Sequence, residues 1–150
     1  MLDSEKERQI VSTVHVSFLS SIGVFALVLW IARRGGAAPL DTAGRNGTAT
    51  GLMLFLGIAE VAWAGWFARR LLSRSTDQPV ARVRSCFFLR FAAAEAVGVF
   101  GLMSGFMGAG AITVGLFFAI AVAALVVAAP SREAWHSALD AASGPAGPLP

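Results

Sequence analysis

The chain has 150 residues, of which 56% are hydrophobic and only 14% are charged, against about 25% charged residues in a typical soluble domain. A water-soluble core of this size cannot hide so much apolar surface, because too little polar surface remains to cover it. The single cysteine, Cys86, excludes an internal disulfide and has no partner for a thiolate metal site. The composition predicts an integral membrane protein, and we expect no metal and no cofactor.

The net charge is +3 and the isoelectric point is near 10.4. The arginines lie between apolar blocks and form no basic stripe interleaved with aromatic residues. Such a distribution is typical of residues at membrane edges and not of a nucleic-acid surface. The sequence therefore predicts the lipid bilayer as a partner and excludes nucleic acid.

Four apolar segments are each close to the roughly 20 residues that a helix needs to cross the hydrocarbon core. They cover about residues 10–32, 48–68, 86–107 and 111–129. None shows the alternation of polar and apolar residues that is typical of barrel strands. The predicted fold is all-α, an integral membrane bundle of four helices.

The end of the chain differs from the apolar segments. Pro130 ends the fourth helix, and Ser131 is suited to cap a short amphipathic segment. Residues 144–150 are rich in Gly and Pro and predict an unordered tail. The chain thus divides into a transmembrane domain, residues 1–130, and a C-terminal part, residues 131–150.

The distribution of Lys and Arg predicts the orientation in the membrane. With the N-terminus inside, eight basic residues face the cytoplasm: Lys6, Arg8, Arg69, Arg70, Arg74, Arg82, Arg84 and Arg132. Three then lie outside: Arg33, Arg34 and Arg45. The positive-inside rule therefore predicts a multi-pass protein of the inner (cytoplasmic) membrane, with both termini in the cytoplasm.

Two acidic residues, Glu60 and Glu95, lie near the middle of their apolar segments. A carboxylate at this depth costs on the order of 3 kcal/mol on insertion scales. Burial disfavours the charged form, so such a group should be neutral near neutral pH and able to exchange a proton. The two carboxyls are expected at similar depth on antiparallel helices, where they can share a proton or face a common pathway. The alternative is a structural contact between helices, which stays open for both and weighs more for Glu60.

Three further polar residues are possible supporting groups for an ion site: His15, Ser20 and Arg90. His15 can join a proton path, or it can bond a neighbour near the headgroups. No second histidine lies within the membrane, which argues against a metal site. Arg90 can extend to the cytoplasmic interface, or it can pair with an acid and hold that acid ionised.

Small residues recur along the third segment, at Gly98, Gly101 and Gly105. Small residues at such spacing allow close approach of two helix backbones in lipid. We expect the third helix to pack tightly against another helix at these positions.

The segment Arg90-Phe91-Ala92-Ala93-Ala94-Glu95-Ala96-Val97-Gly98-Val99-Phe100-Gly101-Leu102 resembles the carboxylate helix of the rotor-ring subunit c of F-type and V-type ATPases. In that family an Ala-rich stretch precedes the ion-carrying acid, and a small-aromatic-Gly-Leu stretch follows it. Asp77-Gln78-Pro79 is similar to the family's polar loop, so the resemblance covers residues 77–103. It implies that Glu95 is a proton- or sodium-binding carboxylate.

These features predict ion handling, or a role within an ion-translocating complex, by a homo-oligomer or a subunit of a larger membrane complex. One alternative is a non-enzymatic accessory or assembly subunit. Another is a small four-helix membrane enzyme that uses Glu60, Arg90 and Glu95 around a pocket open at the level of Arg90. The catalytic motifs of soluble enzymes do not occur in the sequence.

Overall fold

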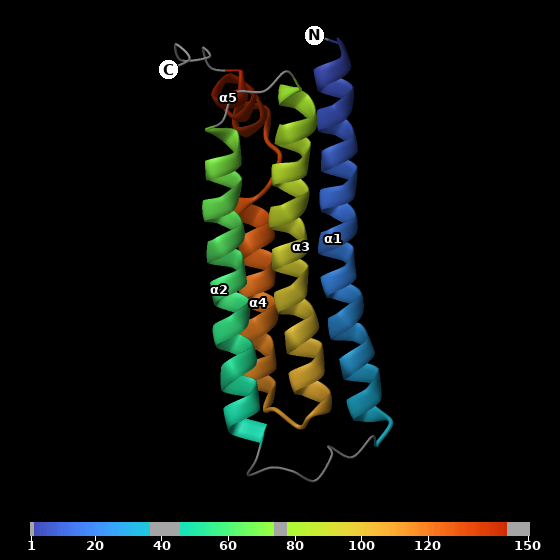
Figure 1. Cartoon of the computed structure of the whole chain (residues 1–150). Coiled ribbons are helices and arrows are strands. Elements are labelled where there is room, and N and C mark those ends of the chain that lie inside the picture. Colours follow the sequence, from blue (N-terminus) through green and yellow to red (C-terminus); the bar gives the residue numbers. More distant parts are fainter. Residues whose placement is uncertain (1, 37–45, 74–77, 144–150) are drawn as a thin grey trace.

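The computed structural model describes residues 2–36, 46–73 and 78–143, and within these ranges the chain is helical with no strand (Figure 1). The predicted all-α class is confirmed. Asp77 and the predicted tail, 144–150, lie outside the described residues. The helices are α1 (Leu2–Arg34), α2 (Asn46–Leu72), α3 (Pro79–Phe106), α4 (Ala111–Val127) and α5 (Arg132–Ala142).

Three helices of the described chain, α1, α2 and α3, are long and apolar enough to cross a membrane. The fourth helix, α4, has 17 residues and is about 25 Å long at 1.5 Å per residue. It is bent by 67° from α5, and the pair counts as a fourth span if it is taken as one. The structure therefore contains three to four candidate spans, and each predicted apolar segment begins within one of these helices.

The centre of the bundle is α3, which packs against α1, α2, α4 and α5. It runs parallel to α1 and antiparallel to α2 and α4, and α1 and α2 lie on its two sides (Figure 1). In its most apolar stretch 44% of the residues are buried, against 17% in α1 and in α2. The bundle is thus organised around one central helix, and its outer helices expose apolar side chains as a lipid-facing surface does.

The turn between α3 and α4 is tight, because α3 ends at Phe106 and α4 begins at Ala111. Gly108 has a φ of 88°, a conformation that side chains rarely adopt. The Ala109 N–H donates to the Ser104 carbonyl (2.9 Å) and the Gly108 N–H to the Gly105 carbonyl (3.3 Å), the Schellman pattern of helix ends. The Arg33 guanidinium donates to the Ala109 carbonyl (2.6 Å) and so attaches the end of α1 to this turn.

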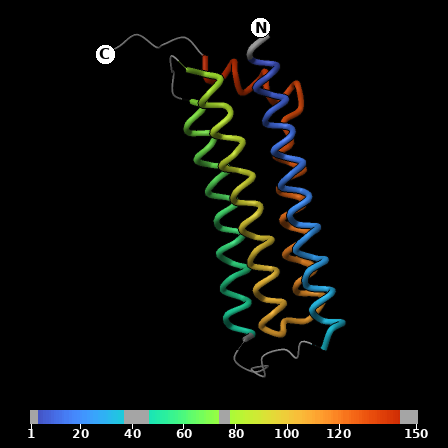
Figure 2. The backbone as a smooth tube through the Cα atoms, turned by 90° about the vertical axis from the view of Figure 1, so that its right-hand side faces the viewer, coloured from blue at the N-terminus to red at the C-terminus, as the bar shows by residue number. Residues whose placement is uncertain are grey.

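Helix α5 crosses the opposite end of the bundle, beside the start of α1 (Figure 2). The Ala134 N–H donates to the Ser131 Oγ (3.1 Å), so Ser131 caps the helix as predicted. Trp135 is fully buried, and its ring centroid lies 5.7 Å from that of Phe87 on α3. The predicted amphipathic segment is therefore a helix whose apolar side covers the bundle end.

The three glycines of α3 differ in how closely other helices approach them. A Cβ at Gly101 would lie 2.7 Å from the Cβ of Phe117 on α4, too close to be tolerated without a backbone shift. A Cβ at Gly105 would overlap the Leu29 side chain of α1, whose end is flexible. Gly98 leaves room for a methyl group in ordinary contact. Helices α3 and α4 therefore approach each other most closely at Gly101, where no flexible side-chain end can move aside.

Candidate functional site

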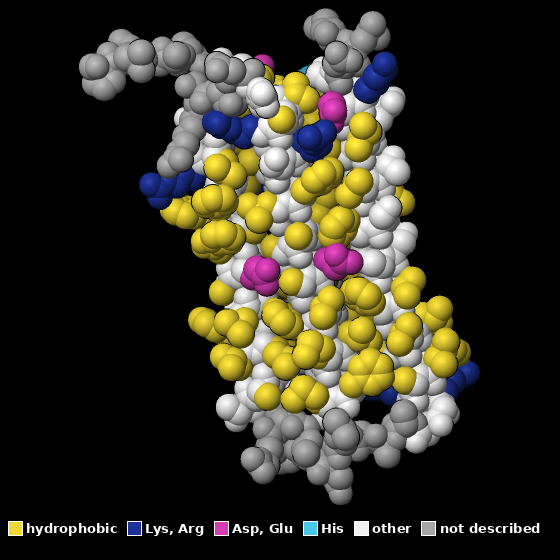
Figure 3. Space-filling view, turned by 45° about the vertical axis from the view of Figure 1, so that its right-hand side comes forward, with side chains coloured by type: hydrophobic (Ala, Val, Ile, Leu, Met, Phe, Trp, Pro, Cys, Tyr) yellow, Lys and Arg dark blue, Asp and Glu magenta, His cyan; other side chains and the backbone are white. Residues whose placement is uncertain are grey.

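Glu60 on α2 and Glu95 on α3 lie at the same level of the bundle. A Cβ at Gly57 would be 3.2 Å from Val97, so these antiparallel helices meet one turn before Glu60 and two residues after Glu95. They are the only acidic residues within α2, α3 and α4. Figure 3 shows two acidic groups at mid-height on one face, surrounded by hydrophobic side chains.

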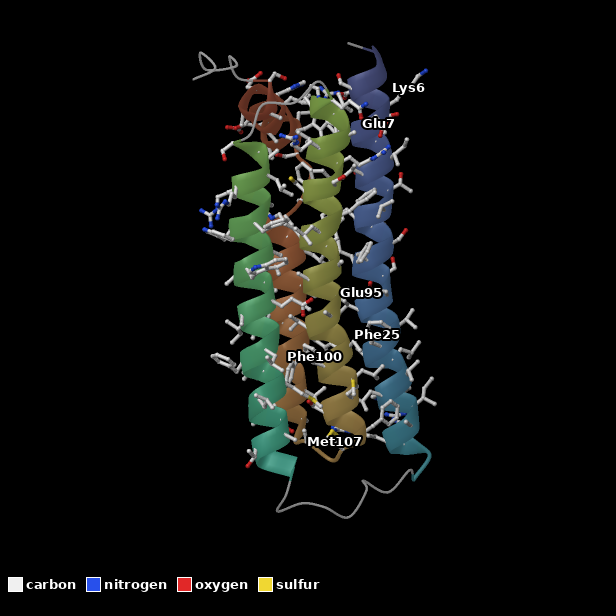
Figure 4. All side chains as sticks on the ribbon, in the orientation of Figure 1. Lys6, Glu7, Phe25, Glu95, Phe100 and Met107 are labelled. Atoms are coloured by element: carbon white, nitrogen blue, oxygen red, sulfur yellow. The ribbon has the colours of Figure 1, made fainter. Side chains whose placement is uncertain are left out.

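Glu95 lies about halfway along α3, on the side of α1 (Figure 4), and is partly buried. The Ser21 Oγ of α1 lies 2.8 Å from the Glu95 Oε1, within hydrogen-bond distance. The same Ser21 Oγ lies 2.8 Å from the carbonyl oxygen of Phe18, in its own helix. Among the described residues, Ser21 is the hydrogen-bond partner of Glu95.

A serine hydroxyl has one hydrogen, so Ser21 can donate either to Phe18 or to Glu95 but not to both. If Glu95 is protonated, its O–H donates to the Ser21 Oγ while the Ser21 O–H donates to the Phe18 carbonyl. If Glu95 is ionised, the Ser21 O–H turns to the carboxylate, which then has a single described donor for its two oxygens. In both forms every hydroxyl hydrogen of this arrangement has an acceptor.

Glu60 has a different environment at the same level. Its side chain is exposed on the outside of α2, together with those of Ile58 and Trp63. No hydrogen bond or ion pair joins it to any described residue, Glu95 included. A proton shared between the two carboxyls stays a prediction.

Ser20 and Ser21 lie on different sides of α1. Ser20 is exposed, and its hydroxyl donates to the Val16 carbonyl of its own helix (2.9 Å). Ser21, which sequence reasoning missed, is the serine that reaches Glu95. Phe18 and the buried Ile22 mark the side of α1 that faces the bundle. Ser21, three residues after Phe18, lies on the same side of the helix.

His15 connects α1 to the end of α4. Its side chain is 9% exposed, and its Nε2 lies 2.9 Å from the Leu125 carbonyl oxygen. Because a carbonyl only accepts, the hydrogen is on Nε2. Leu125 lies in the last turn of α4, where carbonyls lack a donor within the helix. The structure thus gives His15 a bond to a neighbouring helix, and no described hydrogen bond links it to Glu95.

Arg90 lines a cavity of about 340 Å³ between α2, α3 and α5. The other polar residues that line it are Arg69, Cys86 and Ser137. The Cys86 thiol donates to the Ala68 carbonyl (3.6 Å). A pocket does lie at the level of Arg90, as the enzyme hypothesis requires. The three residues of that hypothesis are not brought together, because Glu60 and Glu95 are absent from the lining.

Within the described ranges, no three His, Cys, Asp or Glu side chains lie close enough together to hold a metal ion. Comparison with protein-family models, with curated proteins and with solved structures finds no match to this chain. The resemblance to subunit c is therefore carried by residues 77–103 alone and stays a prediction.

Proposed function

We propose that this integral membrane protein handles protons, and that Glu95 takes up and releases a proton in the middle of the membrane. The observation that carries the proposal is the 2.8 Å contact between the Glu95 carboxyl and the Ser21 hydroxyl, halfway along a helix that can span the membrane. Ser21 acts as the positioning residue for the carboxyl.

The hydrogen bonds around Glu95 accommodate both the protonated and the ionised form. In the protonated form, Glu95, Ser21 and the Phe18 carbonyl form a chain in which each hydrogen has an acceptor. In the ionised form, rotation of one hydroxyl supplies a donor to the carboxylate. A site that accommodates both states with a hydroxyl rotation is suited to reversible proton binding.

The proposal favours a proton over sodium. Hard cations in proteins take about six oxygen ligands. Around Glu95 the described oxygen atoms are those of the carboxyl, of the Ser21 hydroxyl and of the Phe18 carbonyl, which also contacts this hydroxyl. These oxygen atoms are enough to bind one hydrogen and too few to coordinate a cation.

The proposed orientation is that of a multi-pass inner-membrane protein with both termini in the cytoplasm. Support comes from the basic residues at the end of the bundle where α1 starts, where Arg84 pairs with Glu7 (3.0 Å) and Arg132 lies 3.6 Å from Glu5. Cysteines at Ser73 and Gly110 in a Cys86→Ala background test it. They should react from opposite sides of the membrane, and reaction from one side would contradict the proposal.

Labelling with a hydrophobic carbodiimide tests proton binding, since this reagent needs a protonated acid in an apolar setting. In the full chain, mass mapping should find Glu95 modified, with modification weakening as pH rises. Glu95→Gln should remove that product and leave the fold intact. No modification of Glu95 at any pH at which the protein is folded would contradict the proposal.

A second candidate function, that of an accessory subunit, is favoured by Glu60. A carboxyl exposed to lipid at mid-membrane costs on the order of 3 kcal/mol, and a partner helix with a hydrogen-bond donor would remove that cost. A different, larger complex that co-purifies in mild detergent and is lost in Glu60→Leu would support this function. A large species made only of this chain would instead support a ring-forming subunit, as the resemblance to subunit c implies.

A further inference from the structure

The cavity at Arg90 is formed because α5 crosses the end of the bundle instead of continuing the line of α4. Small residues line it on α2 and on α5, where Ala134, Ala138 and Ala141 share one side of the helix. Phe87 and Leu72 add apolar wall. Its volume, about 340 Å³, is within the range of ligand pockets.

Two positive charges face this cavity, and no acidic side chain of the described ranges lines it. Arg90 is partly buried, and its guanidinium has no hydrogen bond or ion pair with any described residue. Arg69 is exposed, bonds only the Gly65 carbonyl of its own helix among the described contacts (3.3 Å), and repels the Arg90 charge.

The acids of the neighbouring helix do not neutralise this pair. Glu133 and Asp140 are exposed on α5 and do not line the cavity. Arginines elsewhere do find carboxylates: Arg8 pairs with Glu5 (2.8 Å), for example. Two guanidinium groups that share a partly buried cavity without an anion from the described residues are suited to an anion from outside the chain.

We propose that this cavity binds the phosphate headgroup of an anionic phospholipid, with Arg69 and Arg90 as the phosphate ligands. The guanidinium fork matches phosphate oxygens in two parallel hydrogen bonds. The cavity lies at the last turn of α2, which carries Arg69 and Arg70, and basic residues at a helix end are typical of the headgroup level of a bilayer. The apolar wall from Phe87 and Leu72 fits the start of the acyl chains.

The proposal does not depend on Glu95, which is outside the cavity. A headgroup bound between α2 and α5 would hold α5 on the bundle, so lipid binding should stabilise the protein. The test uses the full chain, stripped of lipid in an uncharged detergent. Phosphatidylglycerol, phosphatidylcholine and inorganic phosphate are added separately, and bound lipid is counted by native mass spectrometry while the thermal midpoint is followed.

Phosphatidylglycerol should bind and raise the thermal midpoint, whereas phosphatidylcholine and inorganic phosphate at equal concentration should do neither. Equal binding of phosphatidylcholine would overturn recognition of the anionic headgroup. The same rise in the midpoint with inorganic phosphate would overturn the lipid as the source of the phosphate.

Variants distinguish the cavity from general surface attraction. Arg90→Gln should lower phosphatidylglycerol affinity by roughly tenfold or more, and Arg90→Lys, which keeps the charge but loses the fork, should lose less. The matched control is Arg70→Gln: Arg70 is the next residue on α2, stacks over Trp66 (5.2 Å) and does not line the cavity. An equal loss in Arg70→Gln and Arg90→Gln would overturn the proposal. Without lipid, Arg90→Gln should keep the parent's midpoint, because no described contact is lost.

Discussion

Helices α2 and α3 have similar lengths, 27 and 28 residues, and each carries one carboxyl at the same level. On α3, Glu95 is partly buried between helices and has a hydroxyl partner. On α2, Glu60 is exposed and has no partner among the described residues. The level along the bundle is thus the same for both acids, and the side of the helix on which each lies gives them different surroundings.

The same contrast holds for the glycines of the two helices. Gly101 of α3 is in close contact with Phe117, whereas a Cβ at Gly51 of α2 would meet nothing within 4 Å. The central helix is therefore specified by packing at many positions, whereas much of the surface of the outer helix is exposed. Matched mutations in the two helices test this difference in packing.

The largest expected effect is on packing. Gly101→Leu should destabilise the bundle by on the order of 3 kcal/mol, because the Phe117 Cβ is fixed to its backbone and cannot move aside. Gly51→Leu is the matched control on α2 and should leave the thermal midpoint in detergent close to that of the parent. Equal midpoints for the two variants would show that α3 and α4 do not approach closely at Gly101.

A smaller effect is expected from the two adjacent serines. In Ser21→Ala the ionised Glu95 loses its described donor, and a hydrogen bond to a carboxylate is stronger than one to a neutral carboxyl, so carbodiimide labelling of Glu95 should persist to higher pH. In Ser20→Ala the lost bond lies within α1, and the pH profile should not move. Labelling of Glu60 in the same samples serves as an internal reference. A shift in Ser20→Ala, or none in Ser21→Ala, would rule out the positioning role of Ser21.

The smallest effect is expected for Glu60 in the isolated chain. Glu60→Gln removes no described contact and should change the free energy of unfolding in detergent by less than about 0.5 kcal/mol. Chemical denaturation of the purified monomer measures this. A loss above 1 kcal/mol would mean that Glu60 is held within the bundle, contrary to its exposure.

The sequence predicts the elements of this fold better than their mutual arrangement. Runs of apolar residues mark the helices, and Gly108 and Ser131 give the turn and the cap because their backbone requirements are local. The rotation of each helix is harder to predict, because lipid-facing and buried sides of a membrane helix are both apolar. Sequence reasoning therefore placed both acids at the right level but named Ser20 where Ser21 makes the contact.

The partner of His15 on α4 and the lining of the cavity at Arg90 were not predicted. Both depend on where α4 ends and on the 67° bend that follows. After this bend Trp135 packs against Phe87 of α3, a residue far from it in sequence. Pro130 indicates that a helix ends, but it gives no direction for the next one.

The central claim, that Glu95 carries an exchangeable proton, is tested most directly by infrared difference spectroscopy on the full chain in lipid. A pH change should produce a carbonyl-stretch signal from a protonated carboxyl, and this signal should be absent in Glu95→Gln and retained in Glu60→Gln. Ser21→Ala should shift its frequency, because the hydroxyl that bonds the carboxyl is removed. A spectrum at neutral pH that is identical in the parent and in Glu95→Gln would contradict the account.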